Sequence, residues 1–278
     1  MNKNDSLGNR MKQYEGISRN FLTRRVPAII RIDGKAFHTL TKGMRKPFDR
    51  ILMTAMQQTM KYLCENIQGC VFGYTQSDEI TLVLTDYEKI TTDAWFGYNV
   101  QKMTSVSASM ATLAFNDAFA RIVNDEYNKI IYSEQQTPEM EEYLKFFDNY
   151  FNKINTALFD SRAFTVPKEE VCNCLIWRQQ DATRNSIESV GQANFSHKAL
   201  MNKSCNDIQD MLWKEHGINW NDFPTDCKRG SCCYRVLTNT TVINPKTQEE
   251  IPVTRNLWTI DTEIPIFTQD RDFIERLL

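Results

Sequence analysis

The sequence predicts an α+β protein with a mostly antiparallel sheet flanked by helices. The first half of the chain has the order strand, helix, two strands, helix, and further helical segments follow it. The two strands around residues 70–84 are separated by only a few polar residues, which favours an antiparallel pair. We find no internal repeat and no low-complexity linker, so the 278 residues are treated as one unit.

The N-terminal half justifies these elements in order. Apolar residues recur at helical spacing over residues 6–22, PAIIRID (27–33) is typical of a short buried strand, and residues 34–47 form a basic loop. Pro47 begins a helical pattern that Gly69 ends. After it come the strands on either side of QSDE, and a second helix is expected over 101–124.

In the C-terminal half, residues 125–158 resemble a peripheral insertion with a helix beginning at Pro138. Helices are predicted over 169–195 and 206–217. The segment from Ser231 to Ile260 has the alternation of a β-hairpin that turns at Asn244-Pro245.

Composition excludes several classes of protein. The net charge is −2, so the chain as a whole does not attract polyanions such as nucleic acids. A polyanion would have to bind to local basic patches or to a surface completed by a second subunit. The polar N-terminus has no signal-peptide pattern, and no apolar stretch is long enough to span a membrane. Eight cysteines without a CxxC pair indicate reduced thiols and a cytoplasmic protein rather than a zinc site.

The stretch QSDE (76–79) has two interpretations. It is either a plain hairpin turn, in which Ser77 and Asp78 satisfy the backbone, or part of a site. Asp33 ends the strand IIRID, and neighbouring strands would bring its carboxylate close to that of Asp78. Two such carboxylates repel each other and lose solvation, so they need a cation. Mg²⁺ prefers oxygen ligands, and two ions can steady the attacking and leaving oxygens of a phosphoryl displacement.

The residues after Asp33 suit a phosphate ligand. Gly34 allows close approach to the backbone, and Lys35, Lys42, Arg45 and Lys46 supply positive charge. The alternative is a strand-ending turn followed by a solvated basic loop. Taken together, the aspartates, the glycine and the lysines favour a metal and phosphate site.

These residues also carry a family likeness. RIDGKAFH (31–38), KPFD (46–49) and GYTQSDE (73–79) closely resemble the tRNA-histidine guanylyltransferase family and its relatives, the guanylyltransferase-like 3′-to-5′ polymerases. Further matches are FDSRAF (159–164), IWRQQDATRNS (176–186) and KRG (228–230), so the resemblance spans about residues 5–235.

The resemblance implies a palm-like catalytic sheet, similar to polymerase and nucleotide cyclase palms, with two Mg²⁺ ions. It divides the single catalytic unit (1–278) into a palm-like metal and nucleotide site (5–135) and a helical and hairpin elaboration (136–278) with tRNA contacts. By position, Asp33, Gly34 and Asp78 would hold the metals, and Asp33, Asp78 and Glu79 would be catalytic. The residues implied to bind nucleotide are Asp33, Gly34, Lys35, Ala36, Phe37, His38, Lys46, Ser77 and Asp78.

One departure from the family pattern affects specificity. Where the guanylyltransferases carry HINN, this chain has ATRNS, with Thr183 in place of the histidine. The departure favours the branch that repairs tRNA 5′ ends. Candidates for contacts with tRNA or a second triphosphate are Arg184, Asn185, Lys198, Lys203, Lys228 and Arg229; the alternative for each is ordinary surface charge.

The resemblance therefore implies a nucleotidyltransferase that uses ATP, GTP and other nucleoside triphosphates to add nucleotides in the 3′-to-5′ direction to the 5′ end of tRNA. Addition would be template-dependent and would repair truncated ends; the alternative is addition of a single guanosine at position −1. A homotetramer is expected from the resemblance alone. From other classes, a nucleotide cyclase or an RNA-binding protein without catalysis remain as alternatives, whereas Arg31 breaks the DxD pattern of a haloacid-dehalogenase-type phosphatase.

Overall fold

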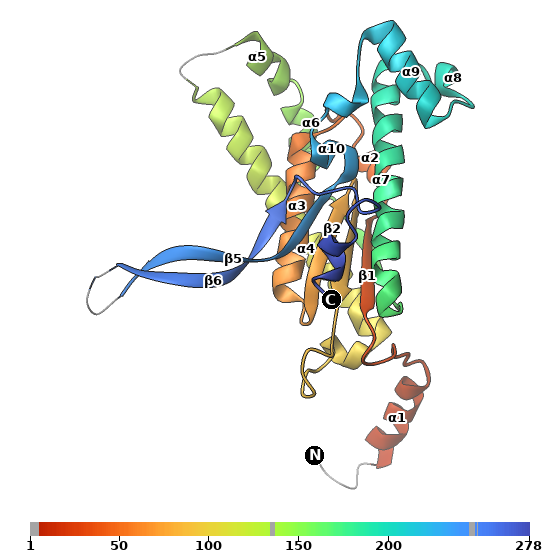
Figure 1. Cartoon of the computed structure of the whole chain (residues 1–278), viewed down its shortest axis with the longest axis vertical. Helices are drawn as coiled ribbons and strands as arrows, with labels where there is room; N and C mark the ends of the chain where they lie inside the picture. Colours follow the sequence, from red (N-terminus) through yellow and green to blue (C-terminus); the bar gives the residue numbers. More distant parts are fainter. Residues whose placement is uncertain (1–5, 134–136, 245–247, 249) are drawn as a thin grey trace.

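The computed structural model of the chain describes residues 6–133, 137–244, 248 and 250–278. In this part of the chain, strands form a six-stranded sheet in the order β4-β1-β3-β2-β5-β6, and all its pairings are antiparallel (Figure 1). The strands are β1 (Ala28–Gly34), β2 (Cys70–Gln76), β3 (Glu79–Leu84), β4 (Phe159–Thr165), β5 (Ser231–Ile243) and β6 (Glu250–Asp261). The predicted fold class is confirmed.

Helices cover both faces of the sheet. The longer ones are α1 (Ser6–Ile17), α3 (Arg50–Asn66), α4 (Val100–Ile131), α7 (Val171–Asn194) and α9 (Cys205–His216). The short ones are α2 (Phe37–Leu40), α5 (Pro138–Leu144), α6 (Phe147–Phe151), α8 (His197–Leu200), α10 (Thr225–Arg229) and α11 (Asp272–Glu275), with 3₁₀ turns η1 (Trp95–Tyr98), η2 (Lys168–Glu170) and η3 (Trp220–Asp222).

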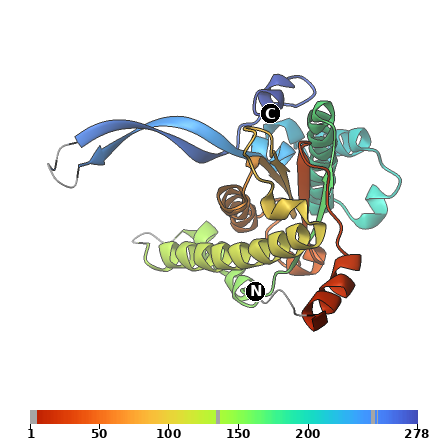
Figure 2. The same cartoon turned by 90° about the horizontal axis from the view of Figure 1, so that it is seen from below.

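The alternation along β1 divides the core into two layers. Ile30 and Ile32 pack with residues of α3 and α4 on one face, and Ile29 packs with α7 and the C-terminal segment on the other. Figure 2 shows α3 and α4 together on one side of the sheet and α7 on the other. Because β1 is covered on both faces, its apolar residues form an almost continuous run rather than an alternation with polar ones.

Asp49 begins α3 in a way that local chemistry explains. Its side chain accepts a hydrogen bond from the backbone N–H of Leu52, at 3.0 Å, as an N-cap residue does. The helix then buries Ile51, Ala55 and Met60 against the sheet. The predicted helix of this region is therefore confirmed, with its first residue at Arg50.

Two helix boundaries differ from the prediction because tertiary contacts replace local preference. α1 ends at Ile17 rather than residue 22, since Phe21 bridges to Asn99 and the N–H of Leu22 donates to the carbonyl of Tyr98. α4 continues to Ile131. Its last turns remain helical because Val123 and Ile130 are buried.

The interpretation of residues 125–158 as a peripheral insertion is wrong. Phe147 and Tyr150 of α6 are almost completely buried and belong to the main hydrophobic cluster. Sequence spacing alone did not indicate this, because α5 and α6 are only 7 and 5 residues long. Segments this short give too few turns for a helical period to emerge.

Strand β4 was not predicted as a strand, although FDSRAF was noted as a motif. It is an edge strand that pairs only with β1, and its residues after Phe159 are partly or fully exposed. Charged residues on an edge strand resemble a loop in sequence. The sheet therefore takes strands from both the 5–135 and the 136–278 segments.

Strands β5 and β6 form the predicted hairpin, in register from the pair Cys232–Asp261 to the pair Ile243–Glu250. Beyond its base, the hairpin extends away from the body as a twisted two-stranded arm (Figures 1 and 2). The predicted turn lies outside the described residues from Pro245 onward. None of the described helices is both long and apolar enough to cross a membrane. The eight cysteines are all free.

The contact between α3 and β2 leaves no room for a larger residue at Gly73. A Cβ there would lie 2.5 Å from the Cys64 Sγ atom and 3.0 Å from the Met60 Cγ atom. We expect Gly73→Ala to lower the free energy of unfolding by about 1–3 kcal/mol, as overpacking does. Gly16→Ala is the control, because nothing lies within 4 Å of that position in α1. Equal denaturant midpoints for the two variants would contradict this packing.

Candidate active site

Asp33 and Asp78 meet at one edge of the sheet. Asp33 is near the end of β1, where it lies opposite Glu79 of β3, and Asp78 is in the two-residue turn between β2 and β3. The N–H of Gly34 donates to the backbone carbonyl of Asp78 at 3.0 Å, which ties the end of β1 to this turn. Ser77 has a positive φ of 51° and its hydroxyl contacts the Asp78 carboxylate at 3.1 Å. QSDE is thus a hairpin turn, and the same turn brings the two predicted carboxylates together.

The electrostatics of the two aspartates are those of crowded, partly buried carboxylates. Burial raises the pKa of Asp33, and the nearby charge of Asp160 raises it further. Burial also raises the pKa of Asp78, with the charge of Asp33 as the next cause. Each effect disfavours the ionised form. A divalent cation would remove this repulsion.

The donor set fits Mg²⁺ with an incomplete protein shell. Within the described ranges, no group of three or more His, Cys, Asp or Glu side chains is arranged to hold a metal ion. Asp33, Asp78 and the carbonyl of Gly34 offer hard oxygen atoms only, which suits an ion that keeps waters and takes phosphate oxygens as further ligands. The assignment of these three residues as ligands stays a prediction.

Glu79 is held in a buried ion pair. Its carboxylate accepts from the Arg178 guanidinium of α7 at 2.9 Å, and both side chains are about nine-tenths buried. Burial raises the pKa of Glu79, whereas Arg178 opposes that rise. Arg178 also contacts Asp181 at 3.4 Å and stacks on Trp177, with its guanidinium carbon 3.6 Å from the ring centroid.

Sequence reasoning missed the arginines around Asp33. The charges of Arg162, Arg31 and Arg178 all lower the pKa of Asp33 and partly offset the effect of burial. Their motifs, FDSRAF and IWRQQ, were noted only as matches. In the sheet, Arg31 lies opposite Arg162, and Asp33 lies opposite Asp160. Each arginine is two residues from the aspartate of its own strand, and residues two apart share a face of the sheet. This spacing is the sequence signal that could have placed the arginines near Asp33.

The residues of the loop after β1 differ in their exposure to solvent. Lys35, Ala36, His38 and Lys46 are exposed. The side chain of Phe37, in contrast, is buried against Phe115 and Phe159 in the core, with ring centroids 5.5 and 5.1 Å away. Phe37 is therefore available to a nucleotide only through its backbone. The contacts of this loop with nucleotide stay predictions.

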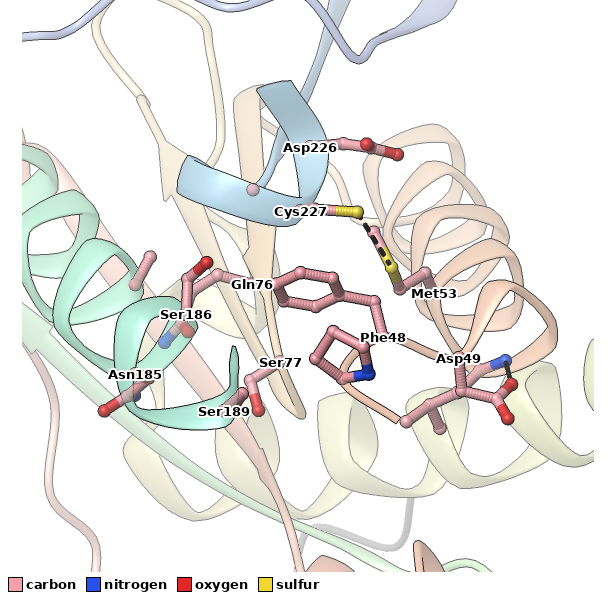
Figure 3. A pocket seen from close by; sticks show the side chains of 14 residues that line it. Phe48, Asp49, Met53, Gln76, Ser77, Asn185, Ser186, Ser189, Asp226 and Cys227 are labelled. Carbon is pink, nitrogen blue, oxygen red and sulfur yellow. Dashed lines mark hydrogen bonds between the residues drawn. The ribbon is translucent and has the colours of Figure 1, made fainter. Parts of the chain in front are cut away.

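A cavity of about 130 Å³ lies beside the β2–β3 turn (Figure 3). Figure 3 shows Asn185, Ser186 and Ser189 of α7 on one side and Met53 of α3 on the other, with the ring of Phe48, from the loop before α3, between them. The cavity is lined by Pro47, Phe48, Asp49, Leu52, Met53, Gln76, Ser77, Ala182, Asn185, Ser186, Ser189, Asp226, Cys227 and Gly230. It therefore brings together two predicted residues, Ser77 and Asn185, from distant parts of the sequence.

Three polar side chains of this cavity make no side-chain hydrogen bond within the described part of the chain. Gln76 is only 8% exposed, yet its side-chain amide makes no hydrogen bond with the described residues. Asn185 and Ser189 also have no side-chain hydrogen bond there. In contrast, Ser186 accepts from the Trp220 indole N–H at 3.0 Å. The amides of Gln76 and Asn185 and the hydroxyl of Ser189 are therefore free to exchange hydrogen bonds with a polar ligand in the cavity.

The remaining candidates for tRNA contact are spread out. Arg184 pairs with Asp181 on the surface of α7. Lys198 lies on α8, and Lys203 lines a separate cavity of about 190 Å³ with His197 and Leu200.

The two basic residues of KRG have backbone partners. Lys228 donates to the carbonyl of Asn221 at 2.6 Å, and Arg229 donates to that of Ile264 at 3.4 Å. These residues follow Asp226 and precede Gly230, both of which line the cavity beside the β2–β3 turn. Contact of these candidates with RNA stays a prediction.

Known proteins resemble this chain over most of its length. The family model described as tRNAHis guanylyltransferase (Thg1) matches residues 8–167. A bacterial tRNA(His) guanylyltransferase (Thg1)-like protein in complex with ATP is 42% identical, with a TM-score of 0.76, over 98% of this chain and 99% of that chain. A similar protein in complex with GTP is 40% identical, with a TM-score of 0.74 and the same coverage. The tRNA(His) guanylyltransferase of Schizosaccharomyces pombe is 25% identical over 238 residues, which cover 81% of this chain and 78% of the relative.

The antiparallel sheet with paired carboxylates at one edge, together with these similarities, defines a nucleotidyltransferase with a palm-type fold. More specifically, the chain belongs to the tRNAHis guanylyltransferase (Thg1) family, whose model matches more than half of its residues.

The raised pKa of Asp78 predicts a pH-dependent stability when divalent ions are chelated. Since the folded chain holds the proton more tightly than the unfolded chain, stability falls as pH rises from the unfolded pKa, near 4, through the higher folded pKa. Asp78→Asn should therefore raise the melting temperature at pH 7, and this gain should vanish below about pH 4. Asp117→Asn, on the exposed surface of α4, is the control. Mg²⁺ should stabilise the wild type more than Asp78→Asn; identical responses of both proteins would contradict the site.

The buried Glu79–Arg178 ion pair predicts that substitutions at the two residues have strongly non-additive effects on the free energy of unfolding. Arg178→Met leaves Glu79 buried without its cation, and we expect a loss of about 3–5 kcal/mol in the free energy of unfolding. The double variant Arg178→Met/Glu79→Gln should recover much of this loss. The exposed Arg184→Met should cost about 0–1 kcal/mol. Chemical denaturation of the wild type, Arg178→Met, Glu79→Gln, the double variant and the Arg184→Met control measures the coupling, and additive effects at residues 79 and 178 would refute it.

Proposed function

We propose that this protein adds nucleotides in the 3′-to-5′ direction to the 5′ end of tRNA. The observation that carries the proposal is the pair of carboxylates at the sheet edge, directly beside the cavity that contains Ser77 and Asn185. Phosphoryl transfer requires charge neutralisation and positioning more than covalent chemistry by the protein. The acidic edge with its surrounding arginines suits that task.

We propose that ATP and GTP bind with the base in the cavity beside the β2–β3 turn and the phosphates toward Asp33 and Asp78. Phe48, Leu52 and Met53 supply an apolar wall, and Gln76 and Asn185 supply side-chain amides. An amide both donates and accepts hydrogen bonds, so it is compatible with either purine. This ambivalence agrees with similar proteins that are solved with ATP and with GTP.

Asp33, Asp78 and the Gly34 carbonyl would hold Mg²⁺ in this proposal. Bound there, the ions would neutralise phosphate charge and steady the attacking and leaving oxygens. The exposed Lys35 and Lys46 would bind the phosphates, and the Glu79–Arg178 pair would hold β3 and α7 at a constant separation beside them. Ser77 would orient the Asp78 carboxylate through their contact.

The proposed reaction has two displacements at one site. In the first, the 5′-monophosphate of tRNA attacks the α-phosphorus of ATP or GTP, and pyrophosphate leaves. In the second, the 3′-hydroxyl of an incoming nucleoside triphosphate attacks the activated 5′ phosphorus, its proton passes to solvent, and the nucleoside monophosphate leaves. Both are displacements at phosphorus, so one pair of carboxylates can serve both.

We further propose that the physiological substrate is a 5′-truncated tRNA and that the template strand selects each nucleotide. Thr183 supports this branch, because its hydroxyl donates to the carbonyl of Gln179 within α7 and no imidazole is present at that position. The second candidate is addition of a single guanosine at position −1, which the family description favours. A cytoplasmic homotetramer remains our proposal for location and assembly.

The deciding experiment uses tRNA that lacks its first nucleotide, with the opposing base varied through all four identities. Base pairing orients the incoming nucleotide without any protein contact to its edge, so the added nucleotide should follow the opposing base each time. A protein that reads guanine itself would need polar groups committed to that base. Guanosine added regardless of the opposing base, with intact tRNA-histidine preferred, would support the second candidate instead.

Asp33→Asn and Asp78→Asn serve as catalytic controls in the same assay. Each should reduce nucleotide addition by at least about 10²-fold, because one ligand of the metal pair is lost. The fold should survive in both, since the substitution keeps the size of the side chain. Near-normal addition by either variant at saturating Mg²⁺ would refute the assignment of these carboxylates.

A further inference from the structure

The loop that follows β1 is held in place by α5, α6 and the chain after them. This loop, residues 35–49, contains α2 and the basic residues assigned above to phosphate binding. The holding segment, residues 138–158, contacts it at successive points. The contacting residues of the segment are Tyr143, Asn149, Tyr150, Lys153 and Leu158.

Tyr150 makes the most buried of these contacts. It is fully buried, and its hydroxyl donates to the Asp49 carboxylate at 2.6 Å. The same carboxylate accepts the backbone N–H groups of Arg45 and Leu52, each at 3.0 Å. Asp49 therefore joins the end of the loop, the start of α3 and α6, and hydrogen bonds to a charged group are among the strong ones.

Lys153 fixes the other end of α2. Its ammonium group donates to the backbone carbonyls of Thr39, at 3.2 Å, and Leu40. These carbonyls lie at the C-terminal end of α2, where a lysine side chain can donate to the last carbonyls of a helix; that of Thr39 also accepts from the N–H of Lys42 at 3.3 Å. Lys35 is tied in as well, because its N–H donates to the carbonyl of Leu158 at 2.8 Å.

The middle of the loop rests on α5 and α6. The Arg45 guanidinium carbon is 4.6 Å from the centroid of the Tyr143 ring. Gly43 has a φ of 82°, and a Cβ there would lie 3.2 Å from the side chain of Asn149. The loop thus adopts a backbone conformation that favours glycine at the point where it meets Asn149 of α6.

The holding segment has a rigid base. Phe147 and Tyr150 are buried in the main hydrophobic cluster, where Tyr150 packs on Phe119 of α4 and Phe147 packs on Tyr127. Because α6 is packed on α4, its contacts with the loop hold the loop at a fixed position relative to the core.

We propose that residues 138–158 are the positioning element of the nucleotide-binding loop, with Tyr150 and Lys153 as its positioning residues. This inference rests on the proposed function, which assigns phosphate binding to the loop. A loop that leaves its binding-competent conformation for part of the time weakens apparent affinity in proportion to the competent fraction. Loss of either contact should therefore weaken nucleotide binding while leaving the carboxylates at the sheet edge in place.

The test compares Tyr150→Phe and Lys153→Met with matched controls. Tyr127→Phe removes a hydroxyl from the same aromatic cluster, and Lys145→Met removes an exposed ammonium group next to α5. We expect the KM for ATP to rise about five- to tenfold in each test variant, with kcat within about twofold and the KM for tRNA unchanged. Lys153→Arg should restore the KM for ATP, because a guanidinium also donates to two carbonyls.

Hydrogen exchange provides a readout that does not depend on activity. Amides of residues 41–46 should exchange several-fold faster in Tyr150→Phe than in Tyr127→Phe, whereas those of β1 and β3 should be unchanged. If Tyr150→Phe fails to fold, Lys153→Met carries the test, since Lys153 is only partly buried.

Unchanged exchange and an unchanged KM for ATP in folded variants would overturn the inference. Failure of the proposed function looks different, because the wild type would then bind neither ATP nor GTP by calorimetry. In that case the role toward nucleotide is overturned with it, and exchange in the loop decides whether residues 138–158 hold the loop at all.

Discussion

The antiparallel pairing of β1 with β3 is the constraint on which the site depends. It places Asp33 opposite Glu79. The hydrogen bond from the N–H of Gly34 to the Asp78 carbonyl then joins the end of β1 to the β2–β3 turn. A register shift of one residue would turn Asp33 to the other face, toward α3 and α4. The apolar residues of β1 oppose such a shift, because Ile30 and Ile32 would then leave their core layer.

This arrangement concentrates negative charge at a partly buried edge. Asp33, Asp78 and Glu79 all have raised pKa values, mainly because of burial. The protein offsets part of the cost with Arg178, whose removal would leave Glu79 without a buried partner. Asp33 and Asp78 form no ion pair with any described residue. They are therefore the carboxylates that remain available for a metal ion, whereas Glu79 is occupied by its structural role.

The cavity and the loop extend this edge into a site for a larger ligand. The cavity wall comes from the loop before α3, the first turn of α3, the β2–β3 turn, α7 and α10, so its shape depends on how these five segments pack. The loop is in turn held by α6 through Asp49 and Tyr150. The carboxylate of Asp49 thus caps α3, binds the backbone of the loop at Arg45 and joins the loop to the core through Tyr150.

The sequence by itself determined the strand IIRID, the pair of strands around QSDE, the helices over most of their length and the convergence of Asp33 and Asp78. These features depend on periodicity, turn chemistry and short separations along the chain, which one sequence displays directly. Only the tertiary structure decided that β4 joins β1, that Phe37 points into the core, that Arg178 pairs with Glu79 and that Tyr150 binds Asp49. The last two contacts join residues 99 and 101 positions apart, and nothing in the local pattern around either partner specifies the other. Such contacts are chosen when whole helices dock on the sheet, because the burial of many side chains together fixes which polar groups must meet.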